Sequence, residues 1–261
     1  MRLLDWLGQG PFSLVLSSGF FGFYAHCGFL RALERAGLSP AAVAGSSAGS
    51  LVGGMWAAGR SSGDIGEELL GLRRSDFWDP GFGAGLLRGA RFGARLREGL
   101  SVRRFEETRA PLAVSIWDVR SRRTRVITHG DLAPAIQASC TFPGLFQPVR
   151  VEGRLALDGG IADRSAMDAL DALDASVRPR VFHHHLASRS PWRRRSDPAL
   201  RPPSRNGLQA IVVEGLPRCG PFRMERGGAA MDAAFEATLQ ALDQPIDEGG
   251  PGRAFFLPGP T

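Results

Sequence analysis

The stretch Ala41-Ala42-Val43-Ala44-Gly45-Ser46-Ser47-Ala48-Gly49 decides the fold, and it leads into a second apolar run over residues 50–58. The residues before Gly45 predict a short buried strand, and the run after Gly49 predicts a helix with small residues on one side. Ser47 therefore lies on a sharp strand-to-helix turn within a G-x-S-x-G motif, the pattern of a nucleophile elbow. Gly45, Ser46, Ala48 and Gly49 complete this elbow, because small residues permit the tight turn and leave the hydroxyl at the positive end of a helix. The simpler alternative is a small-residue turn that packs a helix closely against a sheet.

The segments around the elbow predict an α/β fold. Residues 12–17 predict a strand, residues 24–36 predict a helix that stops at Gly37, and a further helix is expected to start at Ser61 or Ser62. This early alternation of strands and helices favours a mainly parallel sheet. The same patterns predict strands over 111–118, 124–128, 180–186 and 210–213, a hairpin over 149–157, and helices over 132–139 and 228–242.

Length and composition narrow the class of protein. The chain has 261 residues with 43% hydrophobic content, enough for one large domain with a substantial core. The net charge is +6 and every basic residue is Arg. A nucleic-acid footprint would need basic residues clustered with aromatics, and the densest basic cluster, Arg193–Arg195, lies in a loop-like segment, so a nucleic-acid partner is not expected. Three widely spaced cysteines indicate a reducing compartment without a disulfide framework. No apolar run is long enough to span a bilayer and no signal peptide is recognisable, so we expect a cytoplasmic protein.

Two other segments carry groups that could act with Ser47. Residues 14–19 end a strand and lead towards a helix, so their loop offers backbone N–H groups for an oxyanion. Asp158 ends a strand and is followed by Gly159 and Gly160, which leave room for its carboxylate to approach a serine hydroxyl. An aspartate of ordinary pKa is a weak base, so Asp158 would need an apolar, partly desolvated site. Leu157, Ile161 and Phe142 could supply that site.

Four blocks of the chain, taken in order, resemble the patatin-like phospholipases. They are the loop with AHCGFLRALERAGL (25–38), GSSAG (45–49), ASCTFPGLFQPV (138–149) and LDGGIAD (157–163). The resemblance implies a three-layer α/β/α sandwich with a mainly parallel central sheet. It also implies that Ser47 is the nucleophile and Asp158 its base, in a Ser-Asp dyad that hydrolyses lipid acyl esters through an acyl-enzyme, without cofactor or metal.

The loop before the first helix departs from that family's pattern. The family's oxyanion loop is three glycines, a variable residue, Arg or Lys, and a glycine, whereas this chain has Ser18, Gly19, Phe20, Phe21, Gly22 and Phe23 there. The oxyanion hole would have to be built from the backbone amides of residues 19–22. Phenylalanine adopts positive φ poorly, so we expect the loop to follow a different path. A catalytically silent lipid-binding or scaffold protein with the same fold therefore remains the alternative.

The histidines raise two further alternatives. A triad of Ser47, Asp158 and either His183 or His185 has the chain order of the α/β-hydrolases, but the elbow comes after too few strands for that fold. A metal site at residues 183–185 is not expected, because only alternate residues of a strand share a face and no further ligands lie nearby. His26 and His129 are expected to be solvent-facing or held by hydrogen bonds.

We expect a single domain over 1–261, with a core over 12–186, a C-terminal strand and helix over 209–257, and a flexible loop at about 188–206. That loop carries Trp192 among several arginines, and we expect it to contact anionic membranes peripherally. The glycine-rich segment 75–92 carries five large apolar side chains. These could belong to the core or to a lid over the lipid: Phe77, Trp78, Phe82, Leu86 and Leu87.

Overall fold

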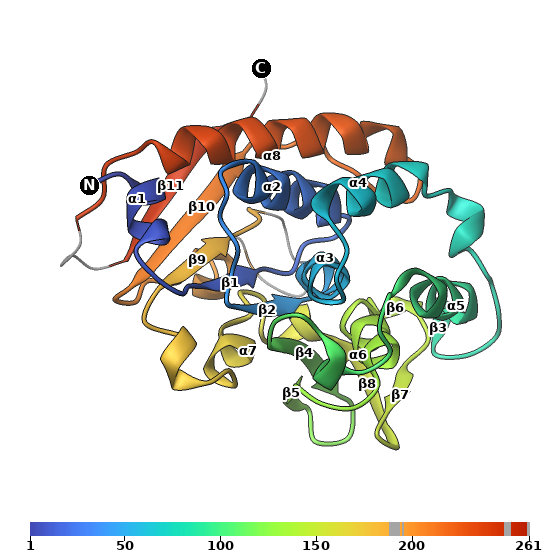
Figure 1. Ribbon diagram of the computed structural model, residues 1–261. Coiled ribbons are helices and arrows are strands. Elements are labelled where there is room, and N and C mark those ends of the chain that lie inside the picture. The colour runs from blue at the N-terminus through green and yellow to red at the C-terminus, as the bar shows by residue number, and fades with distance from the viewer. Residues whose placement is uncertain (188–193, 195, 248–251, 260–261) are drawn as a thin grey trace.

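A central sheet with helices on both faces organises the chain in the computed structural model, which describes residues 1–187, 194, 196–247 and 252–259 (Figure 1). The sheet has nine strands, with the order β11-β10-β9-β1-β2-β4-β8-β7 and with β5 paired to β4 off this path. All pairs from β11 to β4 along this order are parallel, while β8 pairs antiparallel with both β4 and β7. The expected mainly parallel sheet is therefore confirmed.

The strands run as follows: β1 (Ser13–Leu16), β2 (Ala42–Ser46), β3 (Gly85–Leu87), β4 (Leu112–Asp118), β5 (Arg123–Ile127), β6 (Gly144–Phe146), β7 (Val149–Val151), β8 (Arg154–Asp158), β9 (Val181–His184), β10 (Leu208–Glu214) and β11 (Arg253–Pro258). Strands β3 and β6 form a separate parallel pair. The central strands β1, β2 and β9 are buried along their whole length, as expected where helices cover both faces of a parallel sheet.

The helices form the two outer layers. They are α1 (Leu3–Gly8), α2 (Phe23–Arg35), α3 (Ala48–Ala57), α4 (Ser62–Gly71), α5 (Ala90–Gly99), α6 (Leu132–Ser139), α7 (Met167–Asp171) and α8 (Gly227–Leu242). One large core cluster joins one face of the sheet to α1–α6 and α8, and a smaller cluster joins the other face to α7. This arrangement is the expected three-layer α/β/α sandwich, with one layer thinner than the other (Figure 1).

Local signals placed most of the elements within one or two residues. The helix after the elbow starts at Ala48, and α4 starts after Ser61, which caps it in a reciprocal capping box with Asp64. The sequence patterns given above do not predict the N-terminal helix α1, the amphipathic helix α5, the β3–β6 pair or the edge strand β11. Among the described residues, no helix combines the length and apolar character that crossing a bilayer requires.

The segment 75–92 divides between core and surface. Phe77 and Leu87 are buried, whereas Phe82 and Leu86 are exposed. The segment is therefore neither wholly core nor wholly a surface lid. Its two ends pack into the core, whereas the tip between them is exposed. In the expected loop at 188–206, Trp192, Arg193 and Arg195 lie outside the described residues.

Candidate active site

Ser47 occupies the turn between β2 and α3 in a backbone conformation that L-residues rarely adopt. Its φ is 52° and its ψ is −119°, a placement that costs on the order of 1–3 kcal/mol and persists only where the surroundings enforce it. The elbow glycines allow the surrounding backbone to pack closely enough to hold Ser47 in this conformation. A Cβ added at Gly49 would lie 2.1 Å from the carbonyl oxygen of Leu16. Helix α3 can thus approach β1 closely, and Ser47 is held just before the first turn of the helix.

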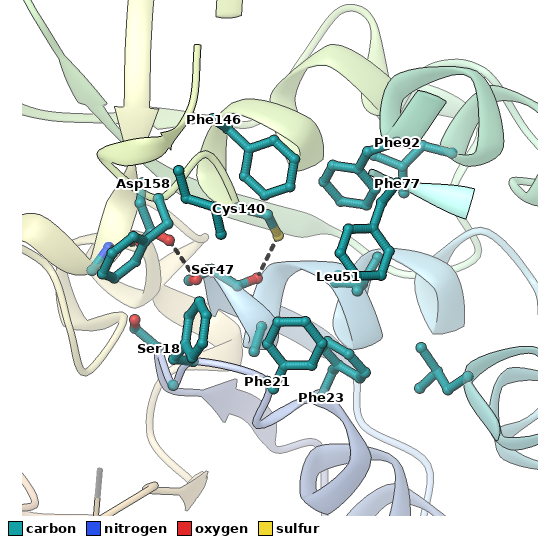
Figure 2. A pocket seen from close by; sticks show the side chains of 18 of the residues that line it. Ser18, Phe21, Phe23, Ser47, Leu51, Phe77, Phe92, Cys140, Phe146 and Asp158 are labelled. Atoms are coloured by element: carbon teal, nitrogen blue, oxygen red, sulfur yellow. Dashed lines mark hydrogen bonds between the residues drawn. The ribbon is translucent and has the colours of Figure 1, made fainter. Parts of the chain in front are cut away.

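Asp158 meets Ser47 at the end of β8. The Ser47 Oγ–H donates to Asp158 Oδ2 at 2.7 Å (Figure 2). The backbone N–H of Gly160 donates to Asp158 Oδ1 at 2.7 Å. Burial raises the pKa of Asp158 from 3.8 to about 6, and the hydrogen bonds from Ser47 and Gly160 and the positive charge of Arg164 oppose this rise. The carboxyl group is therefore more basic than an exposed aspartate and lies within direct proton-transfer distance of the serine.

The two glycines after Asp158 are needed for space. A Cβ at Gly159 would lie 2.2 Å from the carbonyl oxygen of Ser115, and one at Gly160 would lie 2.1 Å from the hydroxyl of Ser18. The chain can turn away from β8 only because these side chains are missing.

Residues that the sequence patterns did not single out fix the backbone of Ser47. Its N–H donates to Ser139 Oγ at 2.9 Å, and Ser139 in turn donates to the carbonyl oxygen of Ser115 at 2.7 Å. The Ser47 carbonyl oxygen accepts from Ser50 Oγ at 2.7 Å and from Cys140 Sγ at 3.2 Å. The block over 138–149 marked this region, but these bonds join elements that only the fold brings together.

The loop before α2 forms a tight turn beside Ser47. The N–H of Gly22 donates to the carbonyl oxygen of Gly19 at 2.8 Å, and Phe21 has a φ of 55°. Phenylalanine therefore does occupy a position that favours glycine, and its ring packs against Phe20, Phe23 and Phe77 at centroid distances of 5.0, 5.3 and 6.0 Å. Aromatic pairs contribute about 0.5–1.5 kcal/mol each, comparable with the cost of the strained residue.

This turn also decides which amides remain available. The Gly22 N–H is used within the turn, whereas the structure gives the N–H groups of Gly19, Phe20 and Phe21 no acceptor among the described residues. Gly19, Phe20 and Phe21 line the same cavity as Ser47, and so does Ala48, whose N–H is at the unpaired N-terminus of α3.

A cavity of about 380 Å³ opens from the dyad, within the size range of small-molecule sites. Ser18, Ser47 and Asp158 lie at one end, and the aromatic rings of Phe21, Phe77 and other residues surround the remainder (Figure 2). The lining is mostly apolar and comes from the loop before α2, from α3, α4 and α5, and from the segment around β6. Buried Arg164 lines the catalytic end, and its carbonyl oxygen accepts from the N–H of Ser18 at 2.7 Å.

The histidines lie apart from the dyad. His26, His183, His184 and His185 are buried, and the contacts of the described residues join none of the chain's histidines to Ser47 or Asp158. His26 is held by hydrogen bonds, as one of the two expectations had it: its Nε2 is 2.8 Å from the carbonyl oxygen of Ser17 and its Nδ1 is 3.0 Å from His184 Nδ1. Within the described part of the chain, no group of three or more His, Cys, Asp or Glu side chains is arranged to hold a metal ion.

Comparison with known proteins finds sequence relatives of this chain. An uncharacterized NTE family protein of Mycobacterium tuberculosis is 32% identical over 168 residues, which cover 63% of this chain and 47% of that protein. A lysophospholipase of Neurospora crassa is 27% identical over 175 residues, covering 63% of this chain and 11% of the fungal protein. This chain thus spans about half the length of its mycobacterial relative and a much smaller part of the fungal one.

Fold and family agree with this relationship. The crystal structure of VipD from Legionella pneumophila superposes with a TM-score of 0.63 at 16% identity, over 89% of this chain and 67% of that chain, which shows a shared fold. The family model of the patatin-like phospholipases matches residues 14–171, more than half of the chain. That span contains the elbow, the loop before α2 and Asp158, and on this match the chain belongs to the patatin-like phospholipase family.

Proposed function

We propose that the protein hydrolyses acyl esters of lipids through a dyad of Ser47 and Asp158. The observation that carries the proposal is the 2.7 Å hydrogen bond between the Ser47 hydroxyl and a buried carboxylate at the end of an apolar cavity. A nucleophile with an adjacent base, placed on a helix N-terminus, is the arrangement that acyl transfer needs. The names of the relatives, among them a lysophospholipase, favour a lipid ester as substrate.

The reaction proceeds in two steps. Ser47 Oγ attacks the ester carbonyl carbon while its proton passes to Asp158 Oδ2, and the tetrahedral intermediate expels the alcohol, which takes that proton. The resulting acyl-enzyme is attacked by water, whose proton again passes to Asp158, and Ser47 regains a proton as the fatty acid leaves. A base with a pKa of about 6 is suited to this transfer near neutral pH.

Backbone donors stabilise the oxyanion in this mechanism. The N–H groups of Gly19, Phe20 and Phe21 are available beside Ser47, and the N–H of Ala48 adds the positive end of α3. Losing one such donor from an oxyanion hole costs about 2.7–4 kcal/mol of transition-state stabilisation. The missing basic residue of the family's loop leaves this arrangement intact, because backbone groups do the binding.

The test is active-site labelling with a fluorophosphonate, together with hydrolysis of a lysophospholipid. Ser47→Ala should abolish both, whereas the matched control Ser46→Ala should keep both, because the buried Ser46 hydroxyl has no hydrogen-bond partner among the residues that the structure describes. Folded wild-type protein that neither labels nor hydrolyses would favour the silent lipid-binding alternative. Loss of activity in His183→Ala or His185→Ala, equal to that of Ser47→Ala, would favour the triad.

A further inference from the structure

The apolar cavity follows helix α3 from one end to the other. Ser47 precedes the first turn of α3, and Leu51 and Met55, one and two turns further on, line the cavity wall. Just beyond the end of the helix, the N–H of Arg60 donates to the carbonyl oxygen of Met55 at 3.2 Å. The catalytic group and Arg60 therefore mark the two ends of one helix.

A cluster of charged side chains gathers at this far end. Arg60 pairs with Glu68 of α4, Glu68 Oε1 lies 3.5 Å from Arg95 Nε of α5, and Arg60 Nη1 donates to the carbonyl oxygen of Gly99 at 3.3 Å. The side chains of Arg60 and Glu68 are only 17% and 18% exposed. The cluster thus joins the segment after α3 to α4 and α5 around the distal part of the cavity.

The cluster separates two different environments. Glu68, Arg95 and Gly99 line the apolar cavity, and the same three residues also line a polar crevice on their other side. The crevice is otherwise lined by charged side chains: Arg60, Asp64, Glu67 and Glu98. Apart from Asp158 and Arg164 at the catalytic end, Glu68 and Arg95 are the charged groups in the cavity lining.

We propose that the Arg60–Glu68–Arg95 cluster is the floor of the acyl site and sets the longest acyl chain that the enzyme accepts. Helix α3 has 10 residues, which at 1.5 Å per residue span about 15 Å. A saturated chain with C–C bonds near 1.5 Å and tetrahedral angles advances about 1.25 Å per carbon, so about 12 carbons fill that length. The inference rests on the proposed function, because the chain is measured from an acyl group on Ser47.

The chain length is limited because the surroundings of the acyl chain change from apolar side chains to ion pairs at the floor. Each methylene buried along α3 should raise the specificity constant about fourfold, until the chain reaches the cluster. A longer chain must press its end against the ion pairs and strip water from them, which is unfavourable for charged groups. Reactivity should therefore rise from butyl to dodecyl chains and fall again for hexadecyl chains.

The experiment measures the rate of Ser47 phosphonylation by butyl, dodecyl and hexadecyl fluorophosphonates. Arg95→Met replaces the charge at the floor by a flexible apolar side chain and leaves Glu68 paired with Arg60. The hexadecyl-to-dodecyl rate ratio should rise about tenfold or more, because two newly buried methylenes at about fourfold each exceed that value. The matched control is Arg97→Met on the exposed side of the same helix, which should leave the ratio unchanged.

A second variant tests the opposite direction. Met55→Trp fills the cavity ahead of the floor, so the dodecyl-to-butyl ratio should fall about tenfold, with folding checked by circular dichroism and thermal melting. Three results would overturn the proposal: a wild type that reacts equally fast with hexadecyl and dodecyl probes, equal ratios in Arg95→Met and wild type, or the same change in Arg97→Met. A wild type that reacts with none of the probes would instead refute the proposed function.

Discussion

Asp158 should reduce the stability of the protein at neutral pH in proportion to its raised pKa. The unfolded carboxyl ionises near 3.8 and the folded one near 6. Between these values the folded state holds a proton that the unfolded state has lost, so stability falls as pH rises through this window. This difference of about two pKa units corresponds to about 3 kcal/mol of unfolding free energy, and the loss is complete above about pH 7.

The substitution Asp158→Asn removes the catalytic base, and it also removes the loss of stability that ionisation of this carboxyl group causes. The amide oxygen can accept from Gly160 as the carboxylate does, and the amide nitrogen can donate to Ser47 Oγ. We therefore expect the variant to lose about 10²–10⁴-fold in turnover, while its free energy of unfolding at pH 7 exceeds that of wild type by up to about 3 kcal/mol.

The assay is urea denaturation of both proteins at pH 4 and pH 7. The stability difference between variant and wild type should be small at pH 4 and grow to about 3 kcal/mol at pH 7. The buried histidines titrate in both proteins, so their contribution cancels in this difference. A difference that stays the same at the two pH values, or a variant less stable than wild type at pH 7, would refute the reasoning.

Three other changes have defined outcomes. Arg164→Gln removes a charge that lowers the pKa of Asp158, so the acid limb of the kcat/KM profile should move to higher pH; an unmoved limb would contradict the electrostatic link. Gly19→Pro removes an N–H that faces no acceptor in the described chain, and turnover should fall by about 10²–10³-fold with folding retained, as judged by circular dichroism. Two of the buried histidines have their pKa lowered to about 4 by burial. Because unfolded histidine binds protons below about pH 6.5, stability should fall as the pH drops from 6.5 towards 4. His183→Leu removes two ring nitrogens that have no hydrogen-bond partner within the described chain, and it should weaken that loss, as thermal melting at pH 5 and 7 can measure.

The sequence by itself determined the local geometry of the site. Only small residues allow the close backbone approaches that the structure has at the elbow from Gly45 to Gly49 and at the pair Gly159–Gly160. These small residues are adjacent in the chain, so the sequence alone indicates both turns. The start of a helix such as α4 can also be predicted from the sequence, because the capping groups of Ser61 and Asp64 are only three residues apart. Strand and helix periodicity predicted the α/β layers, since burial of one face leaves a regular pattern.

Only the tertiary structure decided the surroundings of that geometry. Ser139 and Cys140 bind the Ser47 backbone from α6 and its C-terminal end, and no spacing in the chain indicates this. Phe77 enters the cavity wall while Phe82, five residues later, is exposed, although both belong to one glycine-rich segment. Side chains of the same type thus took different roles according to what the fold placed opposite them.

The charged floor of the cavity illustrates the same division. Arg60 and Glu68 are eight residues apart and Arg95 lies in a later helix, and all three belong to amphipathic or polar stretches that would suit any solvated surface. They meet because α3, α4 and α5 converge at one end of the cavity. Local sequence fixes backbone turns and periodic faces, because these depend on neighbours in the chain. The environment of a side chain, and with it the pKa of Asp158 and the depth of the cavity, depends on distant segments that only the folded chain brings into contact.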